Sequence, residues 1–202
     1  MRFMSGSVQR LVLRVQWTGV LSLVAFLLLC STKPVLAGEV SCPDRWYGLQ
    51  TRHTQLCFQN SEDLQSFASS VKYGPGKWNR SSFFGSLSQS DYEQMLVPKI
   101  DALFARVQEI LDMRKKMERV RIEVYADKAS LSKAYSRFYR GECRIRAWYN
   151  VHNNTVYLNV NDVHAGMVAH ELAHAIIDHY LLVRPPRQTA EILARYVDSH
   201  LE

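Results

Sequence analysis

Two histidines and a glutamate at fixed spacing are the residues of this chain best suited to chemistry. Residues 170–174 read His-Glu-Leu-Ala-His, which is the pattern H-E-x-x-H. In a helix, residues four apart are neighbours on one face, so the imidazoles of His170 and His174 can reach one ion. Zinc accepts neutral imidazole nitrogen and prefers four ligands. Glu171 lies one position round the helix, where it can address a metal-bound water. The pattern therefore predicts a zinc site with a base beside it.

A catalytic zinc site needs a third protein ligand and one open position, and two downstream residues are candidates. His179 would lie on the same straight helix as His174. The extended pattern with a glycine and a third histidine fails, because those positions hold Ile177 and Tyr180. Glu191 begins the next predicted helix, after a Pro-Pro break that would let the chain reverse. Glu191 is the preferred third ligand, although an acid in the first turn of a helix is also a common partner of the helix dipole.

The elements that would position these side chains are strands mixed with helices. Apolar residues at spacings of three and four predict helices, and alternating apolar residues predict strands. In chain order, the patterns predict an irregular lead-in at 38–54, a strand at 55–58, a helix at 61–71, a loop at 72–90, a helix through 100–111, a strand at 120–124, a helix at 131–138, a hairpin at 146–160, a long helix ending near 180 and a last helix at 190–200. This order predicts an α+β fold with a small mixed sheet, an edge hairpin, an active-site helix and a C-terminal helix.

Short polar segments mark where the elements around the site turn or begin. Asn153-Asn154 would form the hairpin turn, because asparagine tolerates the positive φ that tight turns need. Asn161 or Asp162 can cap the long helix, and Thr189 can cap the last helix. Both helices that would carry the site are therefore expected to begin at a side-chain cap.

Residues 1–37 have the pattern of a secretory signal peptide. Three arginines precede an apolar run at 20–30, and Val35 and Ala37 offer a cleavage site before Gly38. The run is shorter than the roughly 20 residues of a membrane-spanning helix, although an uncleaved anchor stays an alternative. We therefore expect residues 38–202 to be one exported domain, periplasmic or extracellular, with no stable membrane span after cleavage.

The charge of the chain is concentrated in this first segment. The 25 basic and 19 acidic residues give a net charge of +6, and residues 1–37 hold four of the bases and no acid. The remaining body is nearly neutral, so its charge gives no reason to expect a nucleic-acid partner.

Three cysteines would remain after cleavage: Cys42, Cys57 and Cys143. An oxidising compartment permits a disulfide. Cys42 and Cys57 are the nearest pair, but the sequence does not fix the pairing. One cysteine would stay free, most simply as a small buried hydrophobic residue.

The segment from His170 to Tyr196 resembles the zincin metallopeptidases of the gluzincin type and is most similar to the peptidase MA-like group. In these proteins, a helix with H-E-x-x-H is followed by a second helix whose glutamate is the third ligand. The resemblance implies a zincin-like fold in which His170, His174 and Glu191 bind one zinc ion. It also implies that Glu171 is the general base.

The resemblance further implies where the substrate lies, and the chain departs from the family pattern in two respects. An edge strand beside the active helix holds an extended substrate in this family, and here that strand would be Thr155–Val160. Many gluzincins carry an acid four residues after the ligand glutamate, whereas this chain has Arg195 there. Asp178 or Asp198 would have to orient a histidine instead. The chain also ends soon after Glu191, so we expect a shallow or open cleft that no large subdomain closes.

The predicted function is zinc-dependent hydrolysis of peptide bonds in a peptide or protein substrate. Zinc would lower the pKa of a bound water, and Glu171 would take its proton and pass it to the leaving amine. The developing negative charge needs a hydrogen-bond donor. The sequence does not select among the candidates, which are Tyr149, Tyr157, His179, Tyr180 and Tyr196.

Two alternatives stay open. The chain could be a zincin-like protein that binds zinc but has no turnover, and that binds peptides or a partner protein through its edge strand. The zinc could also be purely structural. Glu171 argues against a structural site, because such a site has no use for a base.

Overall fold

The computed structural model describes residues 41–74 and 88–201. The predicted signal peptide, its cleavage site before Gly38 and most of the predicted loop at 72–90 lie outside these residues. Residues 40–202 form one compact unit. None of the helices in the described ranges combines the length and the apolar character needed to cross a membrane.

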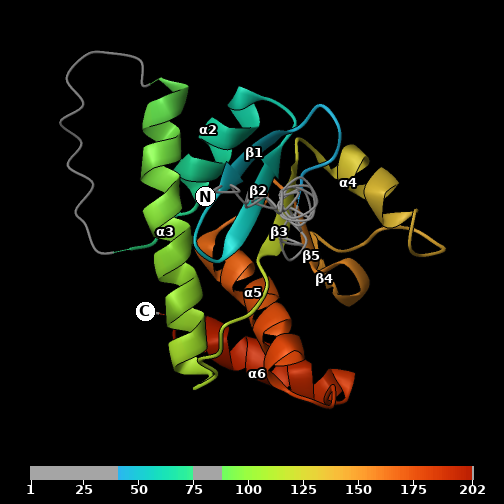
Figure 1. Ribbon diagram of the computed structural model, residues 1–202. Helices are drawn as coiled ribbons and strands as arrows, with labels where there is room; N and C mark the ends of the chain where they lie inside the picture. The colour runs from blue at the N-terminus through green and yellow to red at the C-terminus, as the bar shows by residue number, and fades with distance from the viewer. Residues whose placement is uncertain (1–40, 75–87, 202) are drawn as a thin grey trace, which may run out of the picture. The chain divides into compact units, whose positions relative to one another are not determined.

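A five-stranded mixed sheet organises the described part of the chain (Figure 1). The strand order is β1-β2-β3-β5-β4, in which the three inner strands are parallel and the two outer strands are antiparallel to their neighbours. The strands are β1 (Tyr47–Gln50), β2 (Thr54–Phe58), β3 (Val120–Tyr125), β4 (Ala147–Asn150) and β5 (Thr155–Asn159). The predicted α+β class with a small mixed sheet is confirmed. Strand β1 was not predicted, because it has only four residues and its two apolar side chains, Tyr47 and Leu49, are too few to indicate a strand.

The two faces of the sheet are covered differently, because successive strand residues point to opposite faces. Ile122, Val124 and Leu158 belong to the main apolar core. Four helices contribute to this core: α2 (Ser61–Ser70), α3 (Gln89–Ile110), α5 (Ala165–Tyr180) and α6 (Arg187–Ser199). The opposite face presents Tyr125, Trp148 and Tyr157 to α4 (Lys128–Tyr135) in a separate aromatic cluster. Residues 170–191 therefore lie on the helix-rich side of the sheet.

The hairpin expected at 146–160 is present, but its strands are arranged differently from the expectation. A 3₁₀ turn (Val151–Asn153) and Asn154, at φ 49°, connect β4 to β5. Strand β5 is buried along its whole length and pairs with β3 on one side and β4 on the other. The expectation that Thr155–Val160 forms the edge strand is therefore wrong, and β4 is the edge. The parallel pairing of β5 with β3 forces its hairpin partner to the outside.

The two helices around the site begin at positions that differ from the prediction. Helix α5 begins after His164, whose Nδ1 accepts a hydrogen bond from the Met167 amide at 3.2 Å. Asn161 and Asp162 do not cap it, because their side chains bond Ala126 and Asn159 in the preceding turn. Helix α6 begins three residues before the predicted start, directly after a proline, and has no side-chain cap.

A disulfide joins Cys42 to Cys57 and ties the segment before β1 to β2. This is the pairing that the sequence left open. Cys143 is free and 4% exposed, as expected for a small buried hydrophobic residue.

Candidate metal centre

Three side chains from α5 and α6 converge on one point. His170 and His174 lie one turn apart on α5, with their Nε2 atoms 3.3 Å from each other. Glu191, on the packed helix α6, places Oε1 3.8 Å from His170 Nε2 and Oε2 3.6 Å from His174 Nε2. Within residues 41–74 and 88–201, these three form the one group of His, Cys, Asp or Glu side chains that could hold a metal ion. Figure 1 shows α5 and α6 side by side near the C-terminal end of the chain.

The distances between these atoms fit a tetrahedral metal ion. Zinc lies about 2.0–2.1 Å from nitrogen and oxygen ligands, so two tetrahedral ligands are about 3.3 Å apart. The two imidazole nitrogens are 3.3 Å apart, which matches that value, and the two oxygens of Glu191 lie 3.8 and 3.6 Å from one nitrogen each. One ligand atom from each of the three residues lies within 4.8 Å of the others. Two imidazoles and one carboxylate also suit other divalent first-row metals. The structure therefore shows a group that could hold a metal ion, whereas the choice of zinc belongs to the proposal below.

A second carboxylate from α6 orients the first histidine. Asp198 Oδ2 lies 3.1 Å from His170 Nδ1. A proton on Nδ1 would be donated to this carboxylate, which leaves the Nε2 lone pair facing the candidate metal position. Asp198 follows Glu191 by two helical turns, so both lie on the same side of α6. Of the two acids considered from the sequence, Asp178 instead pairs with Arg184 at 2.7 Å.

Arg195 occupies the position where many gluzincins carry an acid. Its Nε donates a hydrogen bond to Glu191 Oε1 at 3.2 Å. The arginine therefore contacts the carboxylate ligand directly, where an acid would have oriented a histidine. The remaining oxygen of Glu191 faces His174.

Glu171 is buried beside the group without belonging to it. The residue is only 8% exposed. Burial raises the pKa of Glu171 to about 7, whereas His170 and a hydrogen bond from the backbone N–H of Tyr149 oppose this shift. A carboxyl group with a pKa near neutrality can both accept and release a proton under the same conditions. Glu171 is therefore able to exchange a proton near neutral pH.

The surroundings of His174 favour its neutral form, which is the form that binds metals. Burial lowers the pKa of His174, and the neighbouring His170 and Arg187 lower it further, whereas Glu191 and Asp198 raise it. Because only neutral imidazole offers a lone pair to a cation, this shift widens the pH range in which His174 can act as a ligand.

A groove with a volume of about 730 Å³ opens beside His170 and Glu171. Its walls are the chain after α2, the residue that precedes β4, the first turn of α5 and the end of α6. This volume is in the range of pockets that bind small molecules or a few residues of a peptide. The carboxyl group of Glu171 and one candidate ligand therefore face space that a small molecule can enter.

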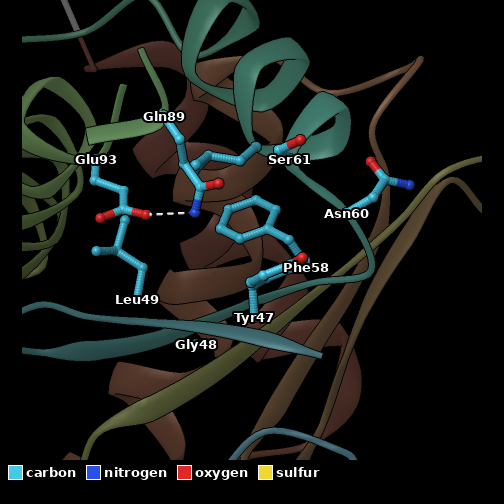
Figure 2. Close-up of a pocket in the computed structure, with 9 residues that line it drawn as sticks. Tyr47, Gly48, Leu49, Phe58, Asn60, Ser61, Gln89 and Glu93 are labelled. Carbon is cyan, nitrogen blue, oxygen red and sulfur yellow. Dashed lines mark hydrogen bonds between the residues drawn. The ribbon is translucent and has the colours of Figure 1, made fainter. Parts of the chain in front are cut away.

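A much smaller hollow lies elsewhere, where α2 and α3 begin. Figure 2 shows the ring of Phe58 beside the hydrogen bond between Gln89 and Glu93, which measures 2.9 Å. The hollow has a volume of about 10 Å³, which is room for about one water molecule. It cannot hold a substrate, and none of its walls belongs to the candidate metal centre.

The candidate donors for a developing negative charge are not brought to the groove. Tyr157 lies on the opposite face of the sheet, and its hydroxyl accepts a hydrogen bond from Asn153 at 2.7 Å. The Tyr149 hydroxyl contacts Asn154 at 3.2 Å, and His179 contacts the carbonyl of its own helix at Ala175. Tyr180 and Tyr196 are exposed on the surface, and none of the five candidates lines the groove.

Sequence reasoning missed the backbone contact of Tyr149 and the basic side chains of the groove. A backbone N–H carries no sequence signal, since every residue except proline has one. Arg146 and Lys72 are 74 residues apart, and their common surface arises only from the tertiary fold.

Comparison with known proteins adds no identification. No protein-family model matches the chain, and neither a curated protein nor a solved structure is significantly similar to it.

Proposed function

We propose that this chain is an exported zinc metallopeptidase of the gluzincin type that hydrolyses peptide bonds. The observation that carries the proposal is the convergence of His170, His174 and Glu191 beside the buried carboxyl group of Glu171. A purely structural metal site gains nothing from a buried carboxyl group that faces a groove. The zincin-like fold, the identity of the metal and the export of the protein are all parts of this proposal.

Zinc held by these three ligands would supply Lewis-acid activation of water and of a carbonyl group. The protein supplies the proton transfers. Glu171 would accept a proton from the attacking water and later return it to the leaving amine. In the metal-free protein, burial already raises the pKa of Glu171 to about 7. Asp198 holds the ring of His170 in the metal-binding orientation.

The edge strand β4 offers a place for the substrate backbone. The carbonyl of Arg146 bonds Asn159 of the hairpin partner, so the alternation of an antiparallel ladder turns the peptide groups of Ala147 and Tyr149 toward the open edge. Glu171 already takes the Tyr149 N–H, which leaves the peptide groups of Ala147 for pairing with a substrate. An extended peptide paired with this edge would therefore pass close to the base.

The substitution Glu171→Gln tests this assignment. We expect it to keep about one zinc ion per chain and to slow cleavage of a mixed peptide library by at least ~100-fold, the scale of general acid–base catalysis. Glu118→Gln is the matched control, because Glu118 is exposed in the segment between α3 and β3. This variant should cleave the library at the wild-type rate. Zinc content by elemental analysis and cleavage by mass spectrometry are the measurements.

Two results would contradict the proposal. Undiminished cleavage by zinc-loaded Glu171→Gln protein would exclude this glutamate as the base. Stoichiometric peptide binding by the wild-type protein, without cleavage, would favour the zincin-like binding protein without turnover.

A further inference from the structure

The groove beside Glu171 contains two basic side chains that have no acidic partner in the described residues. Lys72 and Arg146 line it, are exposed, and form no ion pair within the described residues. The two acids of its walls are already engaged: Asp198 contacts His170 and Glu171 receives the Tyr149 N–H. A ligand in the groove would therefore meet two basic side chains that no acidic side chain of the described residues pairs with.

The first turn of α5 adds to this character. Ala165 and Gly166 line the groove, and the cap at His164 takes the N–H of Met167. No protein acceptor within the described residues takes the N–H groups of Ala165 and Gly166. The N-terminus of a helix carries a partial positive charge and free N–H donors, both of which favour an anion.

Gly166 has a steric reason to be a glycine. A Cβ atom there would lie 3.2 Å from Nδ1 and 3.3 Å from Cε1 of the His164 ring, which is tighter than ordinary van der Waals contact. The glycine thus lets the capping ring lie against the helix and keeps the backbone of the first turn open to the groove.

From these observations we propose that the groove selects a peptide substrate with a carboxylate close to the bond that is cleaved. Lys72, Arg146 and the first turn of α5 would bind this carboxylate. It could belong to an aspartate or glutamate side chain or to the C-terminus of the substrate. The inference rests on the proposed metallopeptidase function and names the substrate class of that same site.

Two peptide libraries that differ only in a fixed glutamate or glutamine test the selection. Each library is made with a free and with an amidated C-terminus, so that the two sources of a carboxylate are separated. We expect the wild-type protein to prefer the carboxylate-bearing library by on the order of fivefold for each basic side chain engaged, the scale of an exposed ion pair. The preference should shrink as salt is raised from about 0.05 to 0.5 M, because salt screens such pairs.

The variants Arg146→Gln and Lys72→Gln should each lose part of the preference, and the double variant should lose nearly all of it. Arg144→Gln is the matched control, because Arg144 lies two residues away, pairs with Glu142 and does not line the groove. Thermal melts establish that each variant is folded. Equal use of the two libraries, or a preference that survives the double substitution, would overturn the inference.

Binding to zinc-loaded Glu171→Gln protein, followed by the anisotropy of fluorescein-labelled peptides, separates this inference from the proposed function. A carboxylate preference in binding without any hydrolysis by the wild type would keep the inference and contradict the peptidase. Hydrolysis without a carboxylate preference would support the peptidase and contradict the inference.

Discussion

The two helices that form the candidate metal centre are anchored very differently. Helix α5 buries eight residues, including Leu172 and Ile176, against the sheet and its neighbours. Helix α6 buries only Ala194 and Val197, and it leaves Ile192 67% exposed. It also lacks a side-chain cap at its N-terminus. Burial is the main source of helix stability in proteins, so α5 is the better fixed of the two.

This difference divides the site into two halves. The histidines and Glu171 belong to the helix that folding of the core holds in place. Glu191 and Asp198 belong to the helix with fewer buried contacts, so a metal ion that bridges the halves would also fasten α6 to α5. Binding and local stability are then linked.

Removal of the metal should have the largest effect, and the local loss of protection should be greater in α6 than in α5. With zinc at about 100 times its dissociation constant, chelation should lower the free energy of unfolding by about 2.7 kcal/mol. Hydrogen exchange should accelerate in α6 (Arg187–Ser199) more than in α5 (Ala165–Tyr180). Glu191→Ala, as the control, should show no response to zinc. Equal loss of protection in both helices would contradict the contrast in anchoring.

The pH dependence of stability should reveal the charge that α5 buries. In chelator, Glu171 has a pKa of about 7 against an ordinary value of 4.5, so the folded chain binds more protons than the unfolded chain between these values. The resulting stability is full below about pH 4.5 and is lost as the pH rises toward 7 and above. Between pH 5 and 8 the loss should be about 2.5 kcal/mol, and Glu171→Gln should abolish it.

Denaturant unfolding of both proteins at several pH values measures this difference. His174 contributes a slope of opposite sign, because burial lowers its pKa and its stability is lost as the pH falls below its ordinary value of 6.5. That slope is present in both proteins and cancels in the comparison. Parallel profiles for the two proteins would show that Glu171 is not desolvated.

The smallest expected effect concerns the contact between the helices through Asp198. Asp198→Asn should weaken zinc binding at least tenfold, or about 1.4 kcal/mol, because the orienting carboxylate of a histidine ligand is lost. Asp178→Asn is the matched control, since Asp178 pairs with Arg184 outside the group. Competition with a chromophoric chelator gives the affinities. An unchanged affinity in the Asp198 variant would mean that the His170 ring is held without it.

The sequence allowed the α5 half of the site to be predicted better than the rest. His170, Glu171 and His174 are close in the chain, and helical periodicity alone places the two histidines together. Glu191 depended on the reversal of the chain between two helices, and the structure does bring it to the histidines. Asp198 was one of two open alternatives, because spacing does not show which side of α6 faces α5.

The errors in the fold arose where tertiary contacts outweigh local patterns. Strand β1 has little apolar sequence of its own and forms by pairing with β2. The edge position of β4 depends on which strand of the hairpin pairs with β3, and this cannot be read from two similar alternating segments. Asn161 and Asp162 are good capping residues by type, but the turn before α5 uses their side chains.

The disulfide between Cys42 and Cys57 has a consequence for the solubility of the chain. It closes a segment with a sequence separation of 15 residues around β1, and closing a loop of that size contributes about 3 kcal/mol. Strand β1 is mostly exposed, whereas its partner β2 is almost entirely buried. Without the bond, β1 could detach and uncover the hydrogen-bonding edge of β2, and uncovered edges pair between molecules. We therefore expect the disulfide to limit aggregation by keeping β1 paired with β2. Protein produced under reducing conditions should form aggregates rich in intermolecular β-structure.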